Sequence, residues 1–395
     1  MTTFAESVTV TDLDRDPYPI YARLREESPV AYVPAVGLWF VTRHADVEFG
    51  ATHPELFAAK PVPSPVDRTF GEDNILTLDG APQRELRSLL DPSFRPRVIE
   101  ASSPALLEPI VHGLLDRVEG SDRAELMADL FEPVSVLGLA RIMGIGEVDA
   151  ETLRRWFAGL AAGATNFEED AAKQALGDAT CREIDARLAP ICERLHAEPD
   201  GSMIANLLEA ADGALAERVA RMMPTIKVII LGGMQEPGHG CGSTTYGLLT
   251  HAGQAEAMRA DPAGCVRRAV EEGLRWIAPI GTQTRRVTRD VELGGVTIPA
   301  GANVGLLVSS ANRDAAVYGA TADLFDLDRP RTPHAAFGFG PHFCVGHHFT
   351  RVQMRLALEQ LFTRFPRLRL DPHRPAELRG WEFRAPARLP VVLGR

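Results

Sequence analysis

Apolar residues recur at helical spacing through most of the chain, and this pattern predicts a mainly α protein. Helices are predicted over residues 15–29, 44–53 and 81–90, and a series of helical segments with acidic breaks covers residues 101–222. Two apolar stripes mark another helix near the C-terminus: Phe349, Val352 and Leu356, then Met354, Leu358 and Leu361.

Alternating or short apolar runs predict strands in two places, about residues 30–42 and 282–308. Residues 60–80 show neither the helical spacing of apolar residues nor the alternation of a strand. Because this long loop carries the apolar residues Phe70, Ile75 and Leu76, we expect it to be a lid that packs against another part of the molecule or a ligand. The chain is therefore predicted to be one α-rich domain over residues 1–395 with a small β-sheet subdomain.

Composition bounds the functional classes. The 395 residues are 45% apolar and 24% charged, which permits a large core, and the net charge of −11 disfavours nucleic acid or an anionic membrane as a partner. The N-terminus lacks the basic and apolar regions of a signal peptide, and no apolar run is long enough to span a bilayer. Five scattered cysteines without a C-x-x-C pair favour a reducing, cytoplasmic location over a disulfide framework or zinc site.

Residues 224–250 are mainly apolar with a glycine-rich centre, which predicts a long helix. Pro237 lacks an N–H and presses on the carbonyl of Gly233, so a kink is predicted there. Gly232 and Gly233 leave room for a flat ligand. The alternative is a kinked helix of the core without a functional role. Burying Gln235 and Glu236 in such a helix would cost free energy, because a buried acid needs a partner or a role.

Residues 337–346 read F-G-F-G-P-H-F-C-V-G and end where the C-terminal helix is predicted to begin. Phe337, Gly338 and Gly340 suit a tight loop, and Gly346 permits close backbone approach. The free N–H groups at a helix start stabilise a thiolate at Cys344, which is what a haem iron needs as an axial ligand. The alternative is a buried structural cysteine.

The spacing F-x-x-G-x-x-x-C-x-G resembles the haem-binding loop of the cytochromes P450. Glu272 and Arg275, about seventy residues earlier, match the family's E-x-x-R; their spacing puts both on one helix face, and flanking Leu274 and Trp276 predict burial. The resemblance runs from about residue 15 to the end. It implies the triangular α-rich P450 fold, haem b ligated by Cys344, and a structural brace at Glu272 and Arg275.

The resemblance also assigns the haem contacts. Arg87, Arg286 and His342 match propionate ligands, while Gln83 stands where the family has histidine. In the oxygen-activating helix, Gln235 takes the place of the family's acid and Glu236 that of its threonine, so we expect the Glu236 carboxylate to relay protons. Further cofactor contacts are expected from Phe337, Gly338, Gly346 and Gly233.

The sequence motif G-x-M-Q-E-P-G-H-G resembles that of one subgroup, the bacterial aromatic O-demethylases that act on guaiacol and syringol. R-T-F-G (68–71), E-P-V-S-V (132–136) and G-W-x-F-R-x-P (380–386) agree. Ala164 replaces a pocket phenylalanine and Gln283 a small apolar residue, which favours syringol over guaiacol. The resemblance implies these substrate-binding residues: Phe70, Leu76, Ala164, Val228, Leu231, Gly232, Ile280, Gln283, Thr284 and Phe383.

The resemblance implies products of formaldehyde and a catechol-type phenol. Electrons from NAD(P)H are expected to arrive through a separate reductase or ferredoxin with flavin and iron–sulfur groups, docked near the haem loop. Two alternatives stay open: a hydroxylase or peroxide-driven oxygenase of another small aromatic or terpenoid, and a non-catalytic haem gas sensor. The docking surface is predicted to include Arg95, Arg97, His347, His348 and Arg351.

Overall fold

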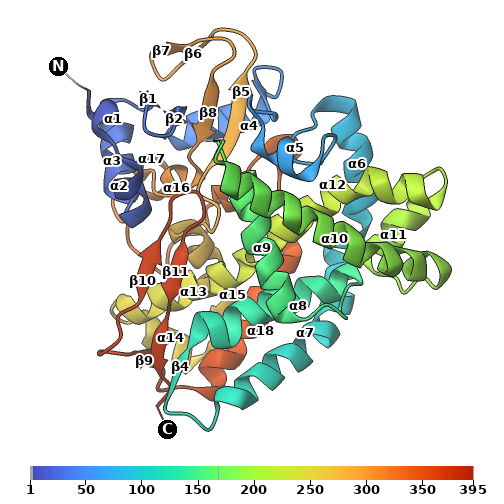
Figure 1. Cartoon of the computed structure of the whole chain (residues 1–395). Helices are drawn as coiled ribbons and strands as arrows, with labels where there is room; N and C mark the ends of the chain where they lie inside the picture. The colour runs from blue at the N-terminus through green and yellow to red at the C-terminus, as the bar shows by residue number, and fades with distance from the viewer. Residues whose placement is uncertain (1–2, 168, 395) are drawn as a thin grey trace.

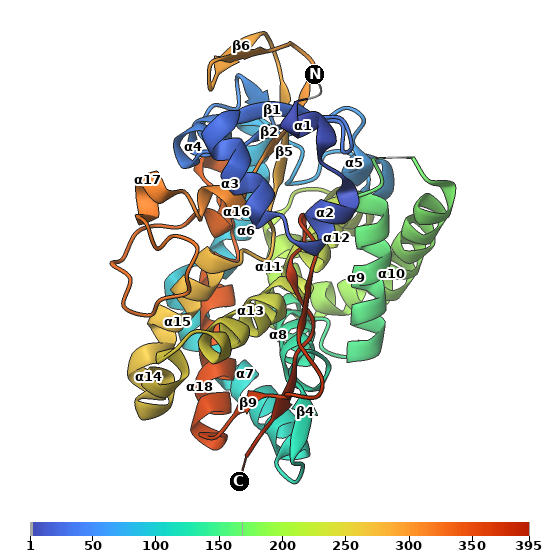
Figure 2. The same ribbon diagram turned by 90° about the vertical axis from the view of Figure 1, so that its left-hand side faces the viewer.

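The computed structural model describes residues 3–167 and 169–394, most of which are helical. Strands gather along one side of the molecule and helices fill the rest (Figures 1 and 2). The longer helices are α3 (Tyr18–Glu27), α4 (His44–Thr52), α6 (Gly80–Phe94), α7 (Pro96–Val118), α8 (Glu132–Met143), α9 (Ala150–Ala164), α10 (Ala171–Ala197), α11 (Met203–Ala210), α12 (Leu215–Met234), α13 (Glu236–Thr250), α14 (Gln254–Ala260), α15 (Pro262–Trp276) and α18 (His347–Arg364). The shorter ones are α1 (Phe4–Ser7), α2 (Val10–Arg15), α5 (Pro65–Phe70), α16 (Val308–Ala311), α17 (Ala315–Tyr318), the π-helix η1 (Met127–Phe131), and the 3-10 helices η2 (Ala335–Phe337) and η3 (Gly340–His342).

The largest sheet has the strand order β1-β2-β8-β5-β3, with β2 and β8 parallel and the other pairs antiparallel. Its strands fall within the two stretches where alternation predicted them, except for β3. The strands are β1 (Val30–Val33), β2 (Leu38–Val41), β3 (Phe57–Ala58), β4 (Arg123–Glu125), β5 (Gln283–Val287), β6 (Val291–Leu293), β7 (Val296–Ile298), β8 (Asn303–Leu306), β9 (Arg369–Leu370), β10 (Glu377–Arg379), β11 (Ala385–Arg388) and β12 (Pro390–Val392).

The helical core confirms the apolar pattern of the C-terminal helix. α18 packs against α7, α13 and α15, which surround it. Of the six stripe residues predicted there, Leu356 is half-buried and the other five are buried. Side chains with helical spacing thus supply the apolar surface that holds α18 in the centre of the fold, directly after the loop that carries Cys344.

The predicted lid, residues 60–80, is more ordered than the sequence indicated, because it contains α5. Ser64 caps this helix by accepting a hydrogen bond from the backbone N–H of Asp67. The buried Asp67 carboxylate accepts hydrogen bonds from Asn74 and Thr77 and pairs with Lys60 at 2.7 Å. This network closes the segment on itself. Phe70 is buried in the helical core, whereas Val62 and Leu76 are exposed.

Candidate active site around Cys344

The loop that carries Cys344 depends on glycine. The backbone N–H of Cys344 donates to the carbonyl of Phe337 at 2.9 Å, and Gly338 and Gly340 have φ angles of +70° and +64°. A Cβ on Gly338 would lie 2.3 Å from Nε2 of Gln283. The backbone conformation therefore favours glycine at position 338, as the predicted tight loop implies, and a larger residue would also displace the end of the Gln283 side chain.

The start of α18 lies three residues beyond Cys344, with Gly346 as its N-cap. Burial raises the pKa of the Cys344 thiol, while a hydrogen bond from the Gly346 N–H and the charge of Arg87 act in the opposite direction and favour the thiolate. The backbone thus aims a donor at the sulfur, as predicted for a cysteine at a helix start. A metal cation would outweigh the desolvation of the thiolate.

Cys344 borders a deep cavity to which α6, α12, α13, β5 and the residue 337–346 loop contribute. Its polar lining is sparse: Arg87, Glu236, Gln283, His342 and Thr350. The apolar lining comes from Ile75, Leu76, Phe94, Leu139, Val228, Ile229, Leu274, Pro279, Ile280, Val308, Ala336, Phe337, Phe343, Val345 and Phe349.

These residues fit a haem whose iron is ligated by Cys344. A Cβ built on Gly232 would meet no atom within 4 Å, so the surface of α12 is free of side chains at this one point of the cavity wall. Glu236 keeps one buried carboxyl oxygen without a partner among the described residues. Arg87 and His342 supply basic groups for propionates at the rim. A flat, anionic, iron-containing group would fit the exposed helix surface at Gly232, the Cys344 sulfur and the basic side chains.

For one propionate ligand, the structure favours Arg285 over the predicted Arg286. Side chains alternate along β5, so Arg285 is buried and Arg286 is exposed on the other face. Burial lowers the pKa of Arg285 to about 10, and nearby Asp79 acts to raise it. Asp79 also pairs with His342 at 2.9 Å. We therefore propose that Arg285 and His342, with Asp79 between them, form the propionate corner.

Gln83 and Arg87 brace the same loop from α6. Gln83 is buried and donates to the carbonyl of Pro341 at 2.8 Å, while Arg87 donates to the carbonyl of Phe343 at 2.7 Å. Gln83 thus binds the backbone of the loop, whereas Arg87 also lines the cavity. Asp91 pairs with Arg87 at 2.8 Å and holds its guanidinium in place.

The long central helix is broken where Pro237 predicted a kink. α12 ends at Met234 and α13 begins at Glu236, with Gln235 between them. Oε2 of Glu236 accepts from the Gln235 N–H at 3.2 Å. Burial raises the pKa of Glu236 to about 8, although two backbone hydrogen bonds oppose the shift. The carboxyl group is therefore mostly protonated near neutral pH and can donate a proton into the cavity.

Replacing Glu236 by glutamine should remove one component of the pH dependence of stability. The folded pKa of about 8 lies above the ordinary value of 4.5, so the folded state binds an extra proton between these values. Stability of the natural protein should therefore fall, relative to Glu236→Gln, as pH rises from about 5 to 8. Urea unfolding of both proteins at several pH values measures this difference, and parallel curves would contradict it.

The predicted substrate-binding residues divide into two groups. Leu76, Val228, Gly232, Ile280 and Gln283 line the cavity. Phe70, Ala164, Leu231, Thr284 and Phe383 are not among its lining residues, and Phe70 instead borders a surface groove with Pro224 and Lys227. Spacing alone could not separate the cavity wall from the layer behind it.

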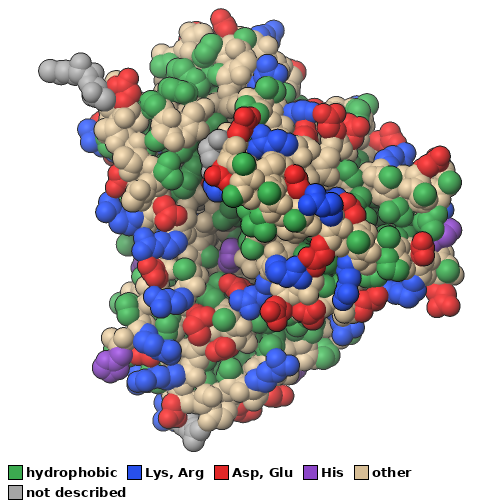
Figure 3. Space-filling model, viewed as in Figure 1, with side chains coloured by type: hydrophobic (Ala, Val, Ile, Leu, Met, Phe, Trp, Pro, Cys, Tyr) green, Lys and Arg blue, Asp and Glu red, His purple; other side chains and the backbone are tan. Residues whose placement is uncertain are grey.

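The predicted docking surface is basic but partly neutralised. Arg351 pairs with Glu271 at 2.6 Å, and His348 pairs with Glu100 at 3.1 Å. Arg95 is exposed. Acidic and basic side chains are also interspersed over the face shown in Figure 3. The role of this surface in docking an acidic redox protein stays a prediction.

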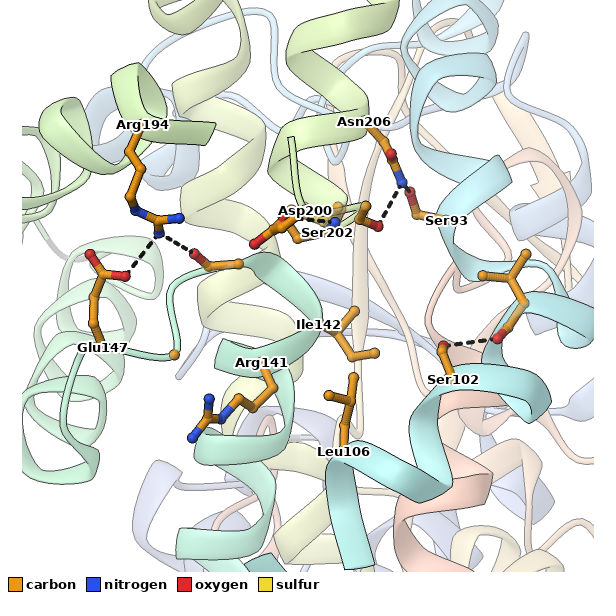
Figure 4. Close-up of a pocket in the computed structure, with 15 residues that line it drawn as sticks. Ser93, Ser102, Leu106, Arg141, Ile142, Glu147, Arg194, Asp200, Ser202 and Asn206 are labelled. Carbon is orange, nitrogen blue, oxygen red and sulfur yellow. Dashed lines mark hydrogen bonds and ion pairs between the residues drawn. The ribbon is translucent and has the colours of Figure 1, made fainter. Parts of the chain in front are cut away.

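A separate polar cleft lies where the ends of α6, α8 and α10 approach the starts of α7 and α11 (Figure 4). Arg194 crosses one side of it and pairs with Glu147 at 2.9 Å, while Asn206 donates to Ser93 at 3.1 Å on the other. The cleft shares no lining residue with the Cys344 cavity. Arg194 and Glu147 thus neutralise each other, and Asp200 accepts a hydrogen bond from the Ser202 N–H at 2.9 Å.

Comparison with known proteins agrees with this geometry. The family model described as "Cytochrome P450" matches residues 265–379. The chain is 32% identical to nocardicin C N-oxygenase of Nocardia uniformis subsp. tsuyamanensis over 394 residues, which cover 95% of this chain and 96% of that protein. It is 31% identical to 6-deoxyerythronolide B hydroxylase of Saccharopolyspora erythraea over 384 residues, covering 92% and 93%.

The fold is similar to that of P450BioI, solved in complex with an acyl carrier protein ligated to hexadec-9Z-enoic acid. The TM-score is 0.88 at 27% identity, covering 97% of this chain and 99% of that one.

A cysteine-bearing loop before a central helix, beside a cavity fit for haem, defines a haem-thiolate protein. The chain belongs to the cytochrome P450 family. It is thus a P450 monooxygenase that binds haem b and receives electrons from a separate redox system. No helix of the described residues has both the length and the apolar character needed to cross a membrane.

Proposed function

We propose that this P450 is an O-demethylase that removes the methyl group of a lignin-derived methoxyphenol, with syringol preferred to guaiacol. The observation that carries the proposal is a mainly apolar cavity in which Oε1 of Gln283 is buried and has no partner among the described residues. A methoxyphenol offers an apolar ring and a phenolic O–H that can donate to such an acceptor. The relatives are a hydroxylase and an N-oxygenase by name, so they leave the substrate open.

The cavity residues have separate tasks in this reaction. Leu76, Val228 and Ile280 enclose the ring, and the Gln283 amide oxygen accepts the phenolic O–H, which orients the methoxy group. The bound haem supplies the activated oxygen atom that enters a methyl C–H bond. Glu236 holds the proton that this chemistry consumes. The resulting hemiacetal breaks its C–O bond to give formaldehyde and a catechol-type phenol.

Substrate size should depend on Ala164, although it is not among the residues that line the cavity. Ala164, at the end of α9, belongs to the same buried apolar cluster as Phe70, Val228 and Leu231. Phe383 forms a β-bridge with Ile280, which lines the cavity. We take Ala164 and Phe383 to support the wall from behind. A small residue at 164 leaves that wall free to yield to a second methoxy group.

The natural protein should bind and demethylate syringol better than guaiacol, and Ala164→Phe should reverse the order. The larger ring would push Val228 toward the cavity and exclude the second methoxy group, with overpacking that costs about 1–3 kcal/mol of stability. The measurement is formaldehyde released per NADH consumed, with a reductase added, for both substrates. Spectral titration of each substrate gives its affinity independently of turnover.

Ala158→Phe is the matched control, because Ala158 is exposed on the same helix. It should leave the preference for syringol unchanged. Equal use of both substrates by the natural protein would contradict the assigned preference. An unchanged order in Ala164→Phe would show that residue 164 does not set the size of the pocket. Failure of both methoxyphenols to shift the haem spectrum would overturn the substrate class.

A further inference from the structure

Three buried polar atoms without a protein partner follow one face of α13. They are Oε1 of Glu236, Nδ1 of His239 and Oγ of Ser243, each unpaired among the described residues. Their spacing of three and then four residues places them one above another on the helix. Thr244, on a different face, instead donates to the carbonyl of Gly240 at 2.7 Å.

The stripe begins at the cavity and leads away from it. Glu236 lines the Cys344 cavity. One turn on, the His239 ring meets Phe157 edge to face, with centroids 6.4 Å apart, and Phe157 meets Phe383 in the same way at 6.4 Å. His239 is only half-buried, so solvent reaches part of this residue.

Leaving these three atoms unpaired would be costly. An unsatisfied buried polar group costs about 1–3 kcal/mol, and proteins usually satisfy such groups with ordered water. Burial lowers the pKa of His239 to about 4, so its ring is neutral at working pH and Nδ1 can accept a hydrogen bond. A water beside Nδ1 can also reach the Glu236 carboxyl one turn below.

We propose that ordered waters bridge Glu236, His239 and Ser243 along α13, and that His239 is the positioning residue that holds the water from which Glu236 is reprotonated. The inference rests on monooxygenase activity in general and not on the choice of methoxyphenol as substrate. It adds a supply route behind Glu236 that the cavity residues do not provide.

Each transfer moves one proton and no electrons. When Glu236 gives its carboxyl proton to the cavity, the water held at Nδ1 of His239 donates a proton to the carboxylate. One O–H bond of that water breaks as the Glu236 O–H bond forms. The water regains a proton from solvent at the partly exposed His239, and the water beside Ser243, which is fully buried, only holds it in place by a hydrogen bond.

Infrared spectroscopy of the holoenzyme tests the water bridge without turnover. The C=O stretch of protonated Glu236 is identified as the band that Glu236→Gln lacks. In His239→Phe this band should move to higher frequency and exchange more slowly in D2O, because the carboxyl loses its bridging water. His239→Asn, which keeps a polar group near the place of Nδ1, should restore the natural frequency in part.

His251→Phe is the matched control, since His251 follows the same helix and its Nδ1 already contacts the Gly247 carbonyl at 3.0 Å. It should leave the band unchanged. Ser243→Ala should slow exchange without a large frequency shift, and it serves if His239→Phe folds poorly. A band with the same frequency and exchange rate in His239→Phe as in the natural protein would overturn the proposal.

Proton delivery supplies a second readout. With any substrate that turns over, His239→Phe should recover less product per NADH, on the order of tenfold less, and show a larger solvent isotope effect than His251→Phe. Product yield and isotope effect equal to those of the natural protein would also overturn the role of His239. Because the infrared measurement needs no substrate, failure of the methoxyphenol assignment would leave its result intact.

Discussion

Cys344→Ser should abolish the thiolate-type absorption band of the reduced, carbon monoxide-bound protein. A serine oxygen at this position would still accept a hydrogen bond from the Gly346 N–H. An alcohol is far less acidic than a thiol, however, and does not donate the same electron density to iron. Monooxygenase turnover should be lost with the band. The measurement is the carbon monoxide difference spectrum, together with haem content per chain.

Cys192→Ser provides the matched control, because Cys192 is buried on α10 away from the cavity. This variant should keep the band even if it loses some stability. A thiolate-type band that persists in Cys344→Ser would mean that another group ligates the haem. Loss of the band in both variants would instead indicate general unfolding.

The sequence was most informative where one residue type is required at fixed spacing. Gly338 is an example, because its φ of +70° is a backbone conformation that other residues rarely adopt. The break before Pro237 is another, since a proline cannot continue the hydrogen bonds of a helix. These features depend on the local backbone alone, so the loop and the kink were predictable.

Features that depend on tertiary packing were less predictable. Arg285 and Arg286 are adjacent and alike in type, so only the pairing of β5 with β8 and β3 decides which one is buried. Asp79 was missed for a similar reason: its pairing with His342 joins residues 263 positions apart. The strict alternation of β5 could have flagged Arg285 once Val287 was taken as an inward residue.

The lid shows a local signal that was present but not used. Ser64 and Pro65 before Asp67 form a helix start, with a capping side chain and proline in the first turn. The irregular composition of residues 60–80 outweighed it. The lack of strand signal in residues 101–222 likewise hid β4, which pairs only with the C-terminal β12 and so depends on a contact distant in sequence.

Arg275→Leu should destabilise the protein more than most single substitutions, because it opens a buried network. Arg275 is 2% exposed and Glu272 6%, and the guanidinium binds both carboxylate oxygens at 2.7 Å. It also donates to the carbonyls of Asn312, Ala322 and Leu324. Leucine would leave these three carbonyls without that donor and would remove one of the two cations that face Glu272.

We expect a loss of about 3–5 kcal/mol of unfolding free energy, since breaking a buried pair leaves an undercompensated charge. Arg329 still contacts Glu272 at 3.1 Å, which keeps the loss below that of an isolated charge. Arg268→Leu is the matched control on α15: it removes an exposed pair with Asp328 and should cost about 1 kcal/mol or less. Urea unfolding of the holoenzyme measures both, and haem retention reports whether the loop has moved. If the two variants lost equal stability, Glu272 and Arg275 would not brace the fold, and the buried network would be a consequence of packing and not a support for the haem loop.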